Sequence, residues 1–366
     1  NLIALSASLE AKKARRMASF KRTTFGVENV LSPVDKFPEL KLPPTTVPDG
    51  WTLTNDGEQL AGTDNFLAIV HIDGNSMGKR VQKIYDKASD SWEECVKRLQ
   101  LFSKAVDDDF EAAYAEMTED LATYLNTANL TDKYFPVRKV IGAGDDVCFI
   151  TSGCLGIECA VSFIKHLKNK INTVDGMAYA ACAGVVLVHK KYPFRTAYEL
   201  SEALCNNAKA FGAQYDPDGS ISAIDWHIEF GQLKESLTSI REDYLTEDDL
   251  LLTLRPLAIT DSADVPEVRK YKFFCSVLEE LRANTDKLPR SKVKQLREAL
   301  RQGEWESKLA LRSMNLQELL WVCVEKLNPD WLQNALEGDT AEKSAYITEA
   351  TDDNVPKRCL YFDAIE

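Results

Sequence analysis

Two adjacent aspartates, Asp145 and Asp146, are the residues of this chain best suited to do chemistry. They follow Gly-Ala-Gly at 142–144 and lie between two apolar, β-branched runs, 137–141 and 147–150. This pattern predicts a β-hairpin that carries both acids at its tip. Neighbouring carboxylates repel each other and favour a cation beside them. Mg²⁺ or Mn²⁺ is the expected ion, because hard divalent cations prefer carboxylate oxygens and leave coordination positions open for phosphate.

A third acid, Asp73, follows an upstream apolar run, 66–72, that predicts a buried strand. The chain then turns toward a helix expected from Lys79 to about Ile84. Ligands collect at such strand ends, and backbone N–H groups at a helix start can hold a phosphate. Arg80 is a further cation at this helix start. The nucleotide-binding residues predicted on these two motifs are Gly74, Asn75, Ser76, Gly78, Lys79 and Gly144.

The order of these motifs resembles one protein family. A strand that ends in D-G-N-x-M-G, followed downstream by a G-x-G-D-D hairpin, is similar to the second palm domain of the large subunit of type III CRISPR effector complexes of the Cmr/Csm type. That subunit is a relative of nucleotide cyclases and palm polymerases. The similarity covers roughly residues 60–330, and the segments that continue it downstream are 180–185, 192–194, 197–209, 224–227, 254–256 and 288–292.

The resemblance implies an α+β fold. This fold is a ferredoxin-like βαββαβ palm of the nucleotide cyclase and polymerase type, with helices on one face of an antiparallel sheet, followed by a helical domain. The apolar periodicity of the sequence agrees with that order of elements. It predicts strands at 66–72, in the hairpin 137–150 and at 178–188, and helices at 91–126, 154–172 and 195–211.

The chemistry implied by the resemblance is two-metal nucleotidyl transfer, in which one ion activates a 3′-hydroxyl and the other clamps the triphosphate. Asp73, Asp145 and Asp146 would be both the catalytic residues and the metal ligands. Lys209, in the helix after the fourth strand, would contact phosphate. The implied product, made from ATP, is a cyclic oligoadenylate that acts as a second messenger in antiviral defence.

The sequence departs from the family pattern at three points. Ala143 stands where the family commonly has the first Gly of Gly-Gly-Asp-Asp, but Ala is disfavoured only at positive φ, so the hairpin is expected to form. Asn75 stands where relatives often carry a second acid. No first palm is recognisable before residue 60, and relatives place ATP between two palms. A second palm is therefore an expected partner, from a missing N-terminal part or from a second copy, together with subunits of a CRISPR RNA–protein complex.

Composition sets the outer bounds. The 366 residues are 45% hydrophobic, which is ample for several domains. The predicted domains are an N-terminal helix with a Pro-rich connector (1–64), the palm (65–232) and a mostly helical C-terminal domain (233–366). A chain that begins with Asn1 indicates a C-terminal fragment of a longer protein. A net charge of −13 argues against broad sequence-independent nucleic-acid binding.

Hydropathy and cysteine usage indicate a cytoplasmic protein. There is no run of about 18 apolar residues, so no membrane-spanning helix is expected. The nine cysteines have no framework spacing and are typical of reduced thiols. Two further groups favour ordinary structural roles: His71 as a core histidine, and the acids 107–109 as a solvated helix face.

Three functions remain open from the sequence. The first is a cyclic oligonucleotide synthase, that is, a nucleotidyltransferase of the CRISPR type. The second is a catalytically inactive palm that binds nucleotide and acts as a scaffold. The third is a stand-alone mono- or dinucleotide cyclase. The sequence does not distinguish ATP from GTP, because no base-contacting side chain is mapped.

Overall fold

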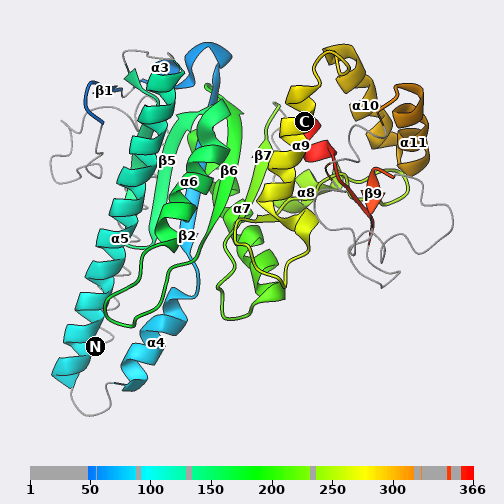
Figure 1. Ribbon diagram of the computed structural model, residues 1–366. Helices are drawn as coiled ribbons and strands as arrows, with labels where there is room; N and C mark the ends of the chain where they lie inside the picture. The colour runs from blue at the N-terminus through cyan, green and yellow to red at the C-terminus, as the bar shows by residue number, and fades with distance from the viewer. Residues whose placement is uncertain are drawn as a thin grey trace. The chain divides into compact units, whose positions relative to one another are not determined.

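The chain forms two compact units, Asn1–Leu233 and Lys234–Glu366. The computed structural model describes residues 48–54, 56–87, 92–128, 134–230, 236–316, 323, 344–347 and 356–366. The N-terminal helix predicted within 1–64 lies outside these residues. Figure 1 shows the helices and strands of the two units.

The first unit is built on an antiparallel sheet that carries the predicted palm topology. Strand β2 is central and pairs antiparallel with β5 on one side and with β6 on the other. The order β4-β5-β2-β6 is the order of a ferredoxin-like βαββαβ fold, so this prediction is confirmed. A further strand, β7, pairs parallel with β6. The strands are β2 (Phe66–Gly74), β4 (Val137–Ala143), β5 (Asp146–Ser152), β6 (Ala181–His189) and β7 (Ala223–Ile228).

Four helices accompany this sheet. The first two, α4 and α5, lie between β2 and β4 in the chain, α6 precedes β6, and α7 connects β6 to β7. Figure 1 shows α6 across the strands, with the long α5 packed beside it. The helices are α4 (Met77–Lys87), α5 (Trp92–Thr127), α6 (Gly156–Lys168) and α7 (Phe194–Tyr215).

Two glycines show which helix covers which face of the sheet. A Cβ on Gly156 of α6 would lie 2.2 Å from the Cβ of Ala68, whereas a Cβ on Gly184 of β6 would lie 2.0 Å from the carbonyl oxygen of Ser201 in α7. Gly184 pairs with His71 of β2. Since positions 68 and 71 are an odd number of residues apart, they point to opposite faces. Thus α6 and α7 cover opposite faces, and the expectation of helices on one face only is wrong for α7.

Coverage on both sides explains why β2 and β6 are apolar along almost their whole length. Leu67–Val70 and Ile72 are at most 1% exposed. The observed elements differ from the predicted ones mainly at their ends. Helix α6 stops at Lys168 rather than 172, and Ile171, expected on its apolar face, is 61% exposed. The helix predicted from apolar spacing is therefore too long at its C-terminal end, where it includes part of the loop before β6.

The described residues of 51–64, inside the predicted connector, form short elements of their own. Strand β1 (Thr52–Leu53) pairs parallel with β3 (Tyr134–Phe135). Helix α3 (Gly57–Ala61) is capped by the Asp56 side chain and is followed by the 3₁₀ turn η1 (Gly62–Asp64). Leu60 of α3 is 1% exposed, so this segment packs as part of the first unit.

The second unit is mostly helical in its described part. A buried ion cluster joins its C-terminal residues to a loop. The Arg255 guanidinium lies 2.8 Å from Glu366 Oε2 and 3.6 Å from Asp363 Oδ1, and stacks 4.9 Å from the Tyr244 ring centroid. The helices are α8 (Leu237–Glu242), α9 (Tyr271–Ala283), α10 (Arg290–Gln302), α11 (Glu304–Ser313) and α14 (Phe362–Ile365), with η3 at Glu267–Arg269. The short strands are β8 (Leu257–Ala258), β9 (Tyr346–Ile347) and β10 (Arg358–Cys359).

No helix in the described part of the chain combines the length and the apolar character that crossing a membrane requires.

Candidate active site

The hairpin that carries the paired acids is closed by two residues, Gly144 and Asp145. Gly144 has φ of +68°, and Gly is the residue favoured at the first position of such a turn. Ala143 is not in the turn, since it ends β4 and pairs with Asp146 at the start of β5. The Ala in place of Gly therefore meets no positive φ, and the hairpin forms as predicted.

The third acid joins the pair across the sheet. Asp73 of β2 lies directly opposite Asp146 of β5, and the Gly74 N–H donates to the Asp145 carbonyl oxygen at 3.1 Å. A Cβ at Gly74 would lie 3.0 Å from Asp145 Cβ and 2.8 Å from Met77 Cε, so a side chain there would crowd the hairpin turn. The structure therefore brings all three predicted acids together at one edge of the sheet.

Asp73 and Asp146 point to the face that α7 covers, since Asp73 lies two residues from His71 on β2. From α7, Lys209 reaches this edge. Its Nζ lies 2.9 Å from Asp73 Oδ2 and donates to the Gly74 carbonyl oxygen at 2.9 Å. Burial acts to lower the pKa of Lys209, but the charge and hydrogen bond of Asp73 outweigh it and hold this pKa above its ordinary value. The predicted site residue Lys209 is thus part of the cluster.

Asp146 is the most enclosed of the three acids, with 3% of its surface exposed. Its Oδ1 lies 3.7 Å from His71 Nδ1. The His71 ring is itself buried and packs edge-on against the Tyr198 ring, with centroids 5.6 Å apart. His71 is a core histidine, as predicted, but it also lies beside Asp146, one of the three acids predicted to bind a metal ion.

The donor set fits a hard divalent cation. Within the described residues, no three His, Cys, Asp or Glu side chains are placed to hold a metal ion. In the structure Asp73 faces Lys209 and Asp146 faces His71. The Lys209 ammonium, however, marks a point where a cation is held by a carboxylate and a carbonyl oxygen, which are the ligands that Mg²⁺ prefers.

The turn after β2 contacts the loop that follows α7. The Asn75 amide donates to the carbonyl oxygens of Gly219 (3.2 Å) and Ile221 (2.8 Å), which a carboxylate could not do. Lys79 Nζ donates to the Pro217 carbonyl oxygen at 2.6 Å. Ser76 has φ of +55° and lies close to Gly219. A Cβ added to Gly219 would lie 2.4 Å from the Ser76 Oγ.

These contacts bear on the phosphate-binding residues predicted in the turn. The Asn75 amide donates to two backbone carbonyls of the neighbouring loop, and Lys79 uses one of its three ammonium donors there. Gly78 is exposed, with no atom within 4 Å of a Cβ built on it. Of the nucleotide-binding residues predicted on this segment, only Gly74 directly contacts the acid cluster.

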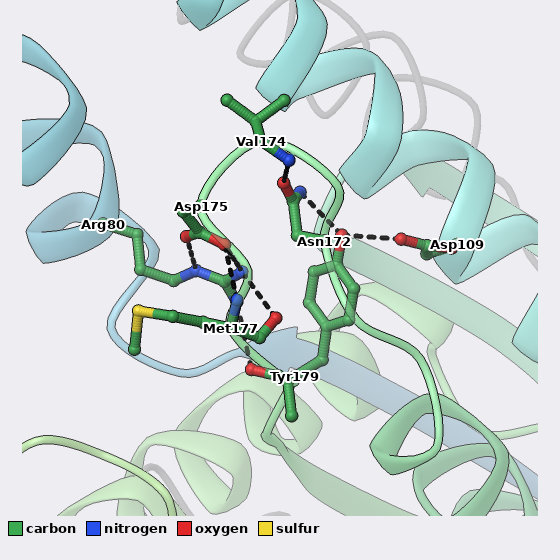
Figure 2. Close-up of polar contacts among 8 residues, drawn as sticks. Arg80, Asp109, Asn172, Val174, Asp175, Met177 and Tyr179 are labelled. Atoms are coloured by element: carbon green, nitrogen blue, oxygen red, sulfur yellow. Dashed lines mark hydrogen bonds and ion pairs between the residues drawn. The ribbon is translucent and has the colours of Figure 1, made fainter.

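Arg80 has a structural role instead of an exposed phosphate-binding one. Figure 2 shows its guanidinium bound to Asp175 in the loop before β6. Nε donates to Asp175 Oδ2 at 2.6 Å, and Nη2 donates to Asp175 Oδ1 at 2.8 Å. Nη2 also donates to the Met177 carbonyl oxygen at 3.1 Å. The guanidinium stacks 4.8 Å from the Tyr179 ring centroid. Arg80 as a whole is 4% exposed. Bidentate Arg–carboxylate pairs of this kind fix geometry well, so Arg80 anchors α4 to that loop.

This pair predicts an acid-sensitive contribution to stability. Burial acts to raise the pKa of Asp175, but the hydrogen bonds from Arg80 and the Met177 N–H outweigh it and hold this pKa below 3.8. An acid with a lowered folded-state pKa stabilises the fold above its unfolded pKa, and this contribution is lost as the pH falls through the folded value. The melting temperature of the wild type should therefore fall more steeply below pH 3.8 than that of Asp175→Asn.

Thermal melts of the full chain between neutral and acid pH measure this difference. Asp218→Asn is a suitable control, because the Asp218 side chain is 90% exposed, and this variant should keep the wild-type pH dependence. Parallel curves for the wild type and Asp175→Asn would show that the pair adds no acid-sensitive stability.

The acids 107–109 on α5 were predicted to be a solvated face, and Asp107 and Asp108 are exposed, as predicted, while Asp109 is half-buried. Asp107 Oδ1 accepts the Gly144 N–H of the hairpin turn at 3.0 Å, and Asp109 Oδ2 accepts the Tyr179 hydroxyl at 2.8 Å. Asp108 pairs with Lys104 at 2.5 Å. The Gly144 N–H is thereby bonded to Asp107 and is not open to a phosphate, although Gly144 was predicted to bind nucleotide.

Helix α5 also holds the other strand of the hairpin. Lys139 of β4 is fully buried, pairs with Glu111 at 2.5 Å and lies 4.6 Å from the Tyr114 ring centroid. These contacts, with that of Asp107, fix the hairpin at two points. No local sequence signal could reveal them, since each joins residues that are far apart in the chain.

Removing the Asp107 acceptor should loosen the hairpin tip. We expect Asp107→Ala to lower turnover by roughly ten- to a hundredfold, because misplaced catalytic groups are costly, and to lower the free energy of unfolding by about 1 kcal/mol. Asp107→Asn keeps an acceptor oxygen and should lose much less of both. Rates of product formation and thermal melts test this, and equal losses in the two variants would contradict a role for the hydrogen bond.

Comparison with known proteins gives a family for this region. Residues 66–214 match the family described as Cas10/Cmr2, second palm domain. A search of curated proteins finds no significant match.

Several solved structures are similar to the chain at low identity. The active GGEEF domain of a diguanylate cyclase from Vibrio cholerae is 14% identical, with 41% of this chain and 80% of that chain covered and a TM-score of 0.26. A Csm1-Csm4 cassette in complex with cA4 is 12% identical, with coverages of 89% and 39% and a TM-score of 0.43. The apo state of a type III-B Cmr-beta complex is 10% identical, with coverages of 82% and 38% and a TM-score of 0.32.

The chain thus spans less than half the length of the Csm1-Csm4 and Cmr chains that it matches. The family match is confined to one region, which contains Asp73, the Asp145–Asp146 hairpin and Lys209. Residues 66–214 of this chain are similar to the second palm domain of the Cas10/Cmr2 family.

Proposed function

We propose that this palm is a metal-dependent nucleotidyltransferase that joins ATP into cyclic oligoadenylate. The observation that carries the proposal is the pairing of Asp73 with Asp146 across β2 and β5, with Asp145 beside them in the hairpin turn. Three carboxylates at one sheet edge have a common use in holding divalent cations against phosphate. In the reaction, a 3′-hydroxyl oxygen bonds to the α-phosphorus of the next ATP, and the bond to pyrophosphate breaks.

Asp73, Asp145 and Asp146 would hold Mg²⁺ or Mn²⁺ in this proposal. The metal, when bound, would favour deprotonation of the 3′-hydroxyl and neutralise charge on the phosphates. The Lys209 ammonium would form an ion pair with a phosphate of the nucleotide. His71 and Asp107 position the acids, His71 at Asp146 and Asp107 through the Gly144 N–H.

A second palm is proposed as the partner that completes the nucleotide site. It would come from another part of a longer chain or from a second copy of this one. We further propose that the palm works with subunits of a CRISPR RNA–protein complex in antiviral defence. Both proposals are supported by the match of residues 66–214 to the Cas10/Cmr2 second palm domain family.

One observation favours a second candidate, a palm that binds nucleotide without turning it over. Asn75, which stands where relatives often have an acid, bonds through both amide hydrogens to the loop at 219–221. This candidate predicts that ATP raises the melting temperature and that no product forms. A stand-alone mono- or dinucleotide cyclase is the third candidate, and it predicts product from the isolated protein, with GTP as a substrate to be tested.

Chromatography of the products tests these alternatives. The full chain is incubated with ATP, and separately with GTP, in Mg²⁺ and in Mn²⁺. Cyclic oligoadenylate from ATP supports the proposed function. Product from GTP, or a cyclic mono- or dinucleotide, supports the third candidate. Nucleotide-induced thermal stabilisation without any product, even with a supplied partner palm, would overturn the proposed function in favour of the second.

A further inference from the structure

The Lys209 ammonium lies at a point on which two oxygens of the site converge. Its Nζ is 2.9 Å from Asp73 Oδ2 and 2.9 Å from the Gly74 carbonyl oxygen. These oxygens belong to consecutive residues at the end of β2, one from a carboxylate and one from the backbone. Both are hard donors of the kind that divalent cations bind. The amine therefore occupies a place that also suits a metal ion.

We propose that Lys209 is a built-in cation that competes with the metal ion for Asp73 and Gly74 and is released toward the nucleotide when the metal binds. This inference rests on the proposed function, since it takes Asp73 as a metal ligand. A Mg²⁺ ion lies about 2.1 Å from its oxygen ligands. An ammonium group bonded to the same two oxygens would overlap and repel it, so only one cation can use them at a time.

The position of Lys209 allows this exchange. Its neighbours on α7, Cys205 and Ala208, are buried, so the backbone of the helix is fixed against the sheet. The side chains of Lys209 and Asp73 are 28% and 29% exposed, so metal and nucleotide can reach them. A lysine head moves on a flexible stem of four carbons. The helix can therefore stay in place while the ammonium leaves the two oxygens.

The displaced ammonium has a natural next partner. Lys209 makes no other hydrogen bond or ion pair with the residues that the structure describes. Once the metal ion binds Asp73 and Gly74, the Lys209 ammonium lies beside a second positive charge. An anionic phosphate can bind both the ammonium and the metal ion. Metal and triphosphate should therefore bind cooperatively, and such a coupling is reciprocal between the two ligands.

Titration with Mn²⁺, followed by the electron paramagnetic resonance of the free ion, tests the competition without measuring activity. The full chain is compared with Lys209→Met, which removes the charge. The matched control is Lys190→Met, since Lys190 follows the far end of β6 and pairs with Glu58 at 3.2 Å. We expect Lys209→Met to bind Mn²⁺ roughly tenfold more tightly than the wild type in the absence of nucleotide. Lys190→Met should bind like the wild type.

A non-hydrolysable ATP analogue should strengthen Mn²⁺ binding in the wild type and do so much less in Lys209→Met. Circular dichroism checks that the variant folds, and Lys209→Gln, which keeps donors but no charge, replaces it otherwise. If the wild type binds Mn²⁺, Asp73→Asn does not, and Lys209→Met binds no more tightly than the wild type, the competition is refuted while the metal site stands. If no form binds Mn²⁺, the proposed function and the inference fall together.

Discussion

Product formation is expected to fall by roughly a thousandfold or more when Asp145→Asn and Asp146→Asn are combined. Bound metal contributes several kcal/mol to the transition state of phosphoryl chemistry, and about 4 kcal/mol corresponds to a thousandfold in rate. Asn keeps the size of each side chain and removes its charge, so the hairpin should form while the metal is lost. The melting temperature should not fall, since repulsion between Asp146 and the facing Asp73 is also removed.

A matched control exists in the second unit. Asp248 and Asp249 are also adjacent and both are exposed. Asp249 has φ of +58°, a conformation that Asn tolerates well. The double variant Asp248→Asn/Asp249→Asn makes the same change in net charge and should keep wild-type turnover. Retained turnover in the hairpin variant would refute the metal assignment of Asp145 and Asp146.

Gly184→Ala is expected to give the largest loss of stability of any single methyl addition near the site. The added Cβ would lie 2.0 Å from the Ser201 carbonyl oxygen and 2.4 Å from the Cys205 backbone nitrogen. Both are backbone atoms of α7, so the helix itself must move away from β6. Overpacking of this kind costs about 3 kcal/mol or more. The shift would also carry Lys209 away from Asp73, so turnover should fall in the fraction that stays folded.

Thermal or urea unfolding of the full chain measures this loss, and Gly78→Ala is the control. Gly78 lies in α4 with no atom within 4 Å of the added methyl. Ala is the better helix former, so this variant should be stabilised by roughly 0.5–1 kcal/mol. An unchanged free energy of unfolding for Gly184→Ala would show that α7 does not pack as closely on β6 as the structure has it.

The three acids were predictable from sequence because each belongs to a short local pattern. Asp73 ends an apolar strand, and Asp145 and Asp146 sit in a hairpin with Gly at the one position of positive φ. Hairpin register follows from the turn itself. That Asp73 should face Asp146 is a further step, and it came from the resemblance to a palm rather than from the residues.

The contacts that position the acids could not be predicted in the same way. The Lys209–Gly74 hydrogen bond joins residues 135 apart in the chain, and the Asp107–Gly144 bond joins residues 37 apart. Periodicity reports which face of an element is apolar, but it does not report which polar group across the fold meets which. Hence the sequence shows neither the bond from exposed Asp107 to Gly144 nor the pairing of Arg80 with Asp175 in the loop before β6.

The covering of the second sheet face was missed for a related reason. Gly184 in β6 looks like any small residue of a buried strand, yet it is the point at which α7 approaches the sheet. The parallel strand β7 follows from α7, because a crossover helix returns the chain in the same direction. Only the three-dimensional arrangement shows that Lys209, through α7, lies on the same face as Asp73.

Anomalous diffraction from crystals grown with Mn²⁺ and a non-hydrolysable ATP analogue tests the assignment of the three acids as metal ligands. This assignment predicts a Mn²⁺ peak bound by Asp73 and the hairpin acids at about 2.1–2.2 Å, with the triphosphate beside it and Lys209 turned from Asp73 to a phosphate. A nucleotide bound elsewhere on the palm, or bound here with no Mn²⁺ at Asp73, would contradict it.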